Sequence, residues 1–226
     1  MPHLLRRAAL AALLLLLPVA RARAQADGLV VRNAGIPTGV GLALDLGFPN
    51  AAAGKGLGVG VTGQLGLGPL GVTGTLARRD PSGSESTRNS VAVSGNLKVF
   101  GGPLVPLTVT LQAGAGRFTS ETRSTPAAPP VATTYWHVPV GVGFALTIPG
   151  VVLAVKPWLA PRLDLLRTKL EGGTSSTDTD LGVSGGVDLS FLSGLSFRLA
   201  YDRVHRAGKN DGVLGLGVGY TFKVGL

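Results

Sequence analysis

The sequence contains no cysteine, few aromatic residues and little charge. None of its 226 residues is cysteine, aromatic residues make up 5% of the chain and charged residues 15%. Without cysteine the chain has no disulfide scaffold, thiolate zinc site, iron–sulfur cluster or cysteine nucleophile. The scarcity of aromatic and charged residues also argues against nucleic-acid binding, which needs a basic face with stacking aromatic side chains.

Long hydrophobic runs are confined to the amino terminus. Arg6 and Arg7 precede an apolar run at residues 8–20, and Ala22-Arg23-Ala24 forms a small-residue cleavage motif. This pattern predicts a signal peptide over residues 1–24 and a mature chain of residues 25–226 that forms one domain. An uncleaved anchor is less favoured because the run is shorter than the ~20 residues that span a bilayer. Cleavage removes four of the 21 basic residues and no acidic residue, so the formal net charge falls from +9 to +5.

The rest of the chain shows an alternation of apolar and small residues. In its last segment, Leu214, Leu216, Val218, Tyr220 and Phe222 alternate with glycine or threonine, which is the two-residue period of a β-strand. Similar segments recur along the chain, near residues 40–48, 57–67, 70–76, 91–99, 107–111, 136–148, 153–165, 181–191, 195–201 and 214–226. The sequence therefore predicts ten strands, or eight if two weak segments merge.

The connections between these segments alternate in length. Short turns stand near residues 68–69, 101–103, 149–150 and 192–194, whereas longer polar links stand near 49–55, 80–88, 119–133, 167–180 and 205–211. An even number of strands with tight turns at one end and loops at the other is typical of a transmembrane β-barrel. Such a sheet must close, because hydrocarbon offers no partner for the N–H and C=O groups of an open edge. We expect a closed up-and-down antiparallel barrel.

This pattern resembles the small bacterial outer-membrane β-barrel proteins, the OmpA-like class. The resemblance implies an outer-membrane location, both termini in the periplasm and the long links outside the cell. It also implies contact with outer-membrane lipid and lipopolysaccharide, and insertion by the barrel-assembly machinery, which recognises the final strand; in this chain that strand ends in Leu226 rather than in an aromatic residue. We expect a monomer without cofactor or metal, and the sequence identifies no protein partner.

The apolar positions of the strands should face lipid and the glycine-rich positions should face the lumen. The alternative is a water-soluble sandwich or lipocalin-like barrel with the apolar face inside. That alternative would put Gly58, Gly60, Gly141, Gly143 and Gly215 on the outer surface, where glycine is poorly suited to strands and to water. Inside a narrow barrel, glycines leave room for large side chains from other strands.

Seven residues are predicted to form a polar cluster on the inner wall. A hairpin centred on Pro149-Gly150 would place His137 opposite Arg162 and Tyr135 opposite Asp164, and a turn at Leu192-Ser193 would bring Asp188 close to Arg198. The whole predicted cluster is Tyr135, His137, Trp158, Arg162, Asp164, Asp188 and Arg198. Charges in such a lumen need partners, so the cluster predicts a salt-bridged plug, with a ligand or proton site as the alternative.

Basic residues near the strand ends suggest a second kind of contact. Arginine binds phosphate through two parallel hydrogen bonds. Arg78, Arg79 and Arg117 are therefore candidates for contact with lipopolysaccharide.

An enzyme is the weakest functional hypothesis. The omptin proteases also have ten strands, with an Asp–Asp and an Asp–His couple at the extracellular rim. Asp178 and Asp180 could form the first couple, but neither mature histidine, His137 or His205, has an acid at matching spacing. We therefore predict an integral outer-membrane barrel with a structural or interaction role and a plugged lumen. A narrow solute pore and a rim hydrolase remain the alternatives.

Overall fold

The chain forms ten antiparallel strands. The computed structural model describes residues 27–30, 39–82, 87–102, 105–122, 131–206 and 209–222, so the expected signal peptide lies outside the described residues. The strands are β1 (Gly39–Pro49), β2 (Leu57–Leu67), β3 (Leu70–Asp80), β4 (Arg88–Gly102), β5 (Val105–Thr122), β6 (Val131–Leu146), β7 (Leu153–Leu170), β8 (Ser175–Phe191), β9 (Leu195–Arg206) and β10 (Lys209–Phe222).

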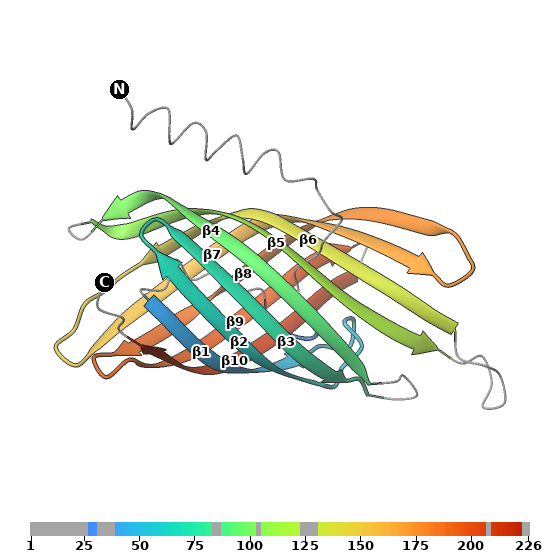
Figure 1. Cartoon of the computed structure of the whole chain (residues 1–226), viewed down its shortest axis with the longest axis horizontal. Helices are drawn as coiled ribbons and strands as arrows, with labels where there is room; N and C mark the ends of the chain where they lie inside the picture. Colours follow the sequence, from blue (N-terminus) through green and yellow to red (C-terminus); the bar gives the residue numbers. More distant parts are fainter. Residues whose placement is uncertain are drawn as a thin grey trace, which may run out of the picture.

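The strands close into one barrel. Each strand pairs with its neighbours in sequence, and β1 pairs with β10 over Val40–Phe222 to Pro49–Val213, which leaves no open edge along the seam (Figure 1). The predicted ten-stranded closed barrel is thus confirmed. β1 begins and β10 ends at the same end of the barrel, where the tight turns lie; we call this the turn end and the opposite end the loop end. In the part of the chain that the structure describes, no helix is long and apolar enough to cross a membrane.

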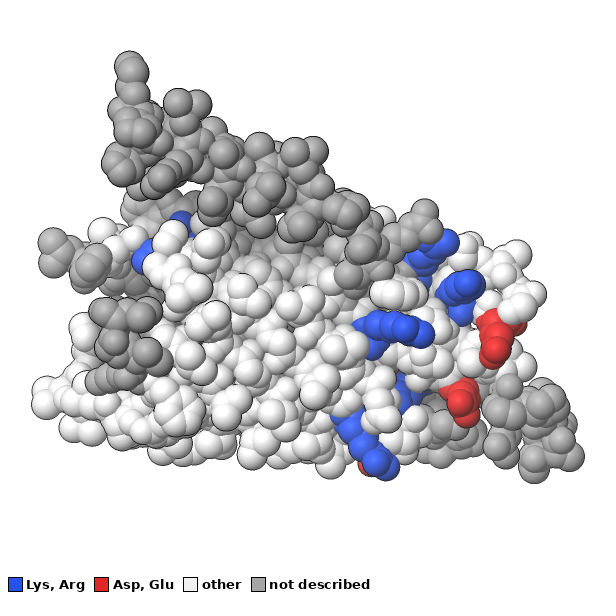
Figure 2. Space-filling model, in the orientation of Figure 1, with Lys and Arg blue, Asp and Glu red and all other residues white. Residues whose placement is uncertain are grey.

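Apolar side chains point outward and small or polar side chains point inward. In β1, Leu44 is 62% exposed, whereas its neighbours Ala43 and Asp45 are 6% and 8% exposed. Outside, the charged residues of the visible face gather mainly toward the loop end, and a broad uncharged zone covers the middle (Figure 2). This arrangement contradicts the soluble alternative, because a soluble barrel would have its apolar face inside.

The strands differ in length around the barrel. β1, β2 and β3 have 11 residues each, while β5 and β7 have 18. About 9–11 tilted residues suffice to cross the hydrocarbon core, so the longer strands extend beyond it. The β7–β8 hairpin stays paired up to Lys169 and Ser175 at the loop end, where it stands out from the barrel (Figure 1).

The predicted register of β6 and β7 is wrong by four residues. Ile148 pairs with Val155, so the turn is centred between Val151 and Val152 rather than on Pro149-Gly150. The chain crosses over later because Pro149 and Gly150 lead into a wider loop instead of forming its tip. As a result His137 lies opposite Leu166, and Arg162 lies opposite Gly141. The turn near Leu192 has the predicted register, since Asp188 lies directly opposite Arg198.

Candidate functional site in the barrel lumen

The inner wall formed by β6 to β9 carries a fully buried ion-pair cluster. The Arg162 guanidinium donates to Asp164 Oδ1 at 2.9 Å, to Asp202 Oδ1 at 2.8 Å and to Ser184 Oγ at 3.2 Å. His137 Nε2 lies 2.7 Å from the same Asp164 oxygen. One cation thus joins two carboxylates on two strands, as buried charges require. We call these five residues the arginine cluster.

The arginine cluster brings together residues that strand pairing alone keeps apart. The register puts His137 two positions from the level of Asp164, yet their side chains meet because both point inward from adjacent strands. Ser184 and Asp202 complete the cluster from β8 and β9. The sequence marks both as inward-facing by parity, but strand parity does not tell which inward-facing residues will meet across the lumen.

A second ion pair closes the lumen nearer the turn end. Arg198 donates two hydrogen bonds of 2.7 Å to the carboxylate of Asp188, and the indole N–H of Trp158 donates to the same carboxylate at 3.3 Å. The Arg198 guanidinium also lies 5.8 Å from the centre of the Trp158 ring. This two-fold hydrogen bonding fixes the guanidinium in one plane.

The opposite side of the lumen is filled by main chain from the amino terminus. Residues 27–30, which precede β1, lie inside the barrel. Asp27 accepts hydrogen bonds from Arg79 at 2.8 Å and from Arg88 at 3.3 Å, and its own N–H donates to Ser90 at 3.0 Å. Leu29 is buried against Ala77 and Ala92. We call residues 27–30 the inner segment.

The inner segment passes over glycines whose missing side chains make room for it. A methyl group added at Gly58 would come within 2.7 Å of the Gly28 carbonyl oxygen, and one added at Gly47 would come still closer to that oxygen. A methyl group at Gly215 would lie 2.5 Å from the Val30 side chain. Gly182 makes room for the Asp164 and Arg162 side chains, as expected, whereas Gly47 and Gly58 make room for a second piece of backbone.

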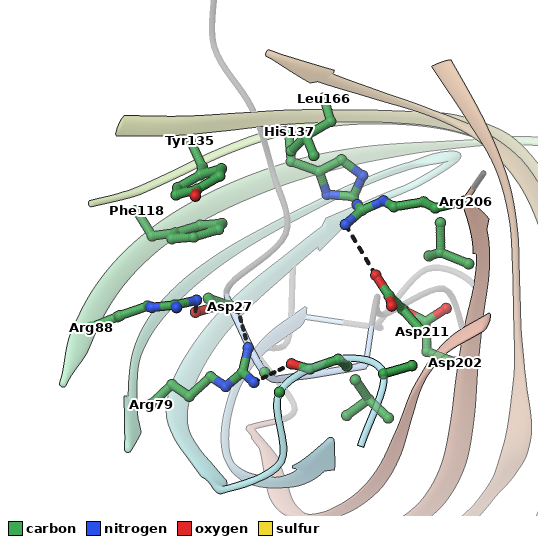
Figure 3. A pocket seen from close by; sticks show the side chains of 16 residues that line it. Asp27, Arg79, Arg88, Phe118, Tyr135, His137, Leu166, Asp202, Arg206 and Asp211 are labelled. Carbon is green, nitrogen blue, oxygen red and sulfur yellow. Dashed lines mark hydrogen bonds and ion pairs between the residues drawn. The ribbon is translucent and has the colours of Figure 1, made fainter. Parts of the chain in front are cut away.

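A cavity of about 300 Å³ lies at the loop end, between the inner segment and the arginine cluster. Tyr135 and Phe118 stack on one side of it with ring centres 4.7 Å apart and planes 12° apart. His137, Arg206 and Asp211 border the other side (Figure 3). Tyr135 thus faces the lumen, but it lies opposite Thr168 rather than Asp164 and stacks on the Phe118 ring.

Arg79 is not at the outer surface, and its expected contact with lipopolysaccharide is wrong. The residue is 5% exposed, points inward and holds Asp27 together with the backbone carbonyls of Ala53 and Lys55. Adjacent residues of a strand face opposite sides, so Arg78 points outward instead. Arg78 Nε lies 3.7 Å from Asp80 Oδ1, and the Arg117 guanidinium lies 5.3 Å from the centre of the Trp136 ring.

The remaining candidates from the sequence are placed at the loop end. Asp180 accepts a hydrogen bond of 2.7 Å from Arg206, and His205 lies 3.0 Å from Asn210 on the exposed side. His205 and Asp202 point to opposite faces of β9, as the sequence predicts. Among the described residues, no three histidine, aspartate or glutamate side chains lie close enough together to hold a metal ion.

An apolar outer band around a closed sheet, with buried ion pairs inside, defines a membrane-spanning β-barrel. Residues 9–222 match the family described as "Outer membrane protein beta-barrel domain". The chain belongs to this family, which places it in the bacterial outer membrane. Comparison with the sequences of curated proteins gives no match.

Solved structures of outer-membrane barrels are similar in fold. The beta domain of the Bordetella autotransporter BrkA is 15% identical over 84% of this chain and 100% of that chain, with a TM-score of 0.50. The N-terminal β-barrel domain of Pseudomonas aeruginosa OprF is 13% identical over 82% and 98%, with a TM-score of 0.39. The outer membrane protease OmpT from Escherichia coli is 9% identical over 85% and 99%, with a TM-score of 0.46. At these identities the likeness concerns the fold alone.

Proposed function

We propose that this protein is a non-conducting outer-membrane barrel with a structural or interaction role that it exerts through its loop end. The carrying observation is the double filling of its lumen. The arginine cluster joins β6 to β9 across buried side chains, and the inner segment packs against β2, β3 and β4. Ion pairs between buried groups hold their geometry strongly, since breaking one leaves a charge without a partner.

Single-channel recording tests the closed lumen. Purified folded protein in a planar bilayer should give no conductance steps. A double variant, Arg162→Ala with Arg198→Ala, removes both cations that bridge the wall, and should give steps or flickering openings. Outward-facing Arg203→Ala is the matched control and should stay silent. Stable steps from the unaltered protein would overturn the proposal and favour the narrow pore.

Lipopolysaccharide is the partner that the outer surface favours. Arg78 and Arg117 are both exposed near the loop end, where the phosphates of that lipid lie. The double variant Arg78→Ser with Arg117→Ser should retain less lipopolysaccharide through purification, and heat-modifiable gel mobility would show that the barrel still folds. Unchanged retention by a folded variant would refute this contact.

A hydrolase is the second candidate because the fold pairs His137 with an acid that sequence spacing does not reveal. Asp164 orients one ring nitrogen at 2.7 Å, and the ring also borders the loop-end cavity. A histidine held in this way can act as a general base on water. If the protein cleaves fluorogenic acyl esters or peptides, His137→Gln should abolish turnover while His205→Gln leaves it unchanged. Turnover that survives His137→Gln would exclude this site.

A further inference from the structure

The inner segment occupies a site that recognises it by charge. Asp27 is held from two strands, since its carboxylate accepts from Arg79 of β3 and Arg88 of β4, and its N–H donates to Ser90 of β4. Arg79 in turn donates to Lys55 O in the β1–β2 connection at 3.1 Å. The Asp27 side chain is 9% exposed and that of Arg79 is 6% exposed. A buried carboxylate held by two arginines is a specific contact rather than a surface encounter.

The rest of the site recognises main chain by shape. Gly28 lies over Gly47 and Gly58, Leu29 lies over Gly60 beside Ala77, and Val30 lies against Gly215. A wall of glycines leaves room for a second peptide backbone, whereas larger side chains would fill that space. The sequence order that fits this wall is an acid, a glycine and two aliphatic residues.

The direction of the inner segment follows from its contacts. Arg79 and Arg88 stand at the loop end, beside the connection between β3 and β4, so Asp27 lies at that end. Val30 packs deeper, against Ala200 and Gly215 of β9 and β10. Gly39, where β1 starts, pairs with Gly66 at the turn end. Asp27 and the start of β1 thus lie at opposite ends of the barrel.

We propose that the glycine-lined half of the lumen is an internal binding site for a short peptide segment that turns at Gly28, occupied by residues Asp27–Val30 of the same chain, and that it directs the amino-terminal side of Asp27 out of the loop end. The family resemblance implies two periplasmic termini. In this arrangement the carboxyl-terminal end of β10 stays at the periplasmic turn end, whereas the amino-terminal side of Asp27 faces the cell surface. This placement does not depend on whether the lumen conducts.

A cysteine cross-link tests the occupancy of the site in the full-length protein. Because the chain has no cysteine of its own, any intramolecular disulfide must join the two introduced cysteines. Leu29→Cys with Ala77→Cys should form an intramolecular disulfide in the oxidising periplasm, seen as a gel shift reversed by reductant. Leu29→Cys with Leu76→Cys is the control, since Leu76 is next to Ala77 but is 66% exposed on the outer face, and should not cross-link.

Folding is checked in the same gels by heat-modifiable mobility. A folded first pair without a cross-link would overturn the proposal. If that pair does not fold, Leu29→Cys with Ala92→Cys takes its place, because Ala92 packs in the same cluster.

Labelling of intact cells tests the direction. A short Gly-Ser spacer with one cysteine is inserted directly before Asp27, downstream of the expected cleavage site. A membrane-impermeant maleimide should label it on intact cells as fully as it labels Ser176→Cys in the β7–β8 hairpin. Val151→Cys, which is 93% exposed at the turn end, should be labelled only after the outer membrane is permeabilised. An inserted cysteine that behaves like Val151→Cys would overturn the outward direction.

Discussion

The two halves of the lumen are filled in different ways. On the β6–β9 side, long charged side chains reach across and bond to one another, with Arg162 at the centre. On the side formed by β1 to β4 and β10, glycine and alanine line the wall beside residues 28–30, and a piece of backbone fills the space there. The comparison teaches that one closed barrel can exclude water either with side chains of its strands or with a segment outside the sheet. The two solutions should respond differently to substitution.

The largest effect is expected in the side-chain half. Arg162→Ala leaves Asp164 and Asp202 buried without their shared cation, and should lower the free energy of unfolding by about 3–5 kcal/mol. Urea unfolding in lipid vesicles, followed by tryptophan fluorescence, measures this loss. Arg203→Ala, on the outer face of β9, should change stability by less than about 0.5 kcal/mol. Equal losses in the two variants would contradict a central role for Arg162.

The charged anchor of the inner segment should matter less. Asp27→Asn removes the negative charge between Arg79 and Arg88 but keeps an acceptor, so the loss should be about 2 kcal/mol. The inner segment can also leave the lumen and rehydrate, which limits the cost. The same unfolding assay, combined with the Leu29–Ala77 cross-link, should show a less stable barrel with reduced cross-linking. Full cross-linking at unchanged stability would show that the ion pairs do not hold the segment.

A methyl group added in the glycine half should cost about 1 kcal/mol. Gly47→Ala places a carbon against the Gly28 carbonyl oxygen, which belongs to rigid backbone, and overpacking of this kind is destabilising. The expected signature is a weaker Leu29–Ala77 cross-link in a barrel that still folds. Unchanged stability and cross-linking would mean that the segment does not lie over Gly47.

The smallest effect is expected on the outer face of the same half. Gly63 points to lipid and has no heavy atom within 4 Å of where its side chain would stand. Gly63→Ala should therefore change the free energy of unfolding by no more than about 0.5 kcal/mol. Comparing the stability changes of Gly47→Ala and Gly63→Ala shows whether glycine is needed because of the inner segment or because of the strand itself.

The sequence predicts the barrel well because its main signal is the alternation of side chains. Ten apolar segments become ten strands, and their parity gives the lipid-facing side. The same parity also determines the direction of Arg79: if Leu70, Val72 and Leu76 face outward, Arg78 faces outward and Arg79 inward. Strand parity therefore predicts that Arg79 faces the lumen, although its position near the strand end led to the prediction of a contact at the outer surface.

Other features of the lumen depend on information that alternation does not carry. The register of β6 and β7 depends on the shape of the loop around Val151, and a proline-glycine pair does not reveal whether it stands at the tip or at the entrance of a loop. Residues 27–30 show no strand periodicity, so nothing local places them inside. A weak indication is that two basic residues, Arg79 and Arg88, stand opposite each other at inward positions of β3 and β4.

The seam between β1 and β10 imposes an order on the events of assembly. These strands pair over ten consecutive residues, from Val40 with Phe222 to Pro49 with Val213. Before they meet, the nascent sheet is a curved wall, and Asp27 can reach Arg79 and Arg88 from the open side. After they meet, the same residues could arrive only lengthwise through a lumen crossed by the arginine cluster. Docking of Asp27 should therefore precede closure of the seam.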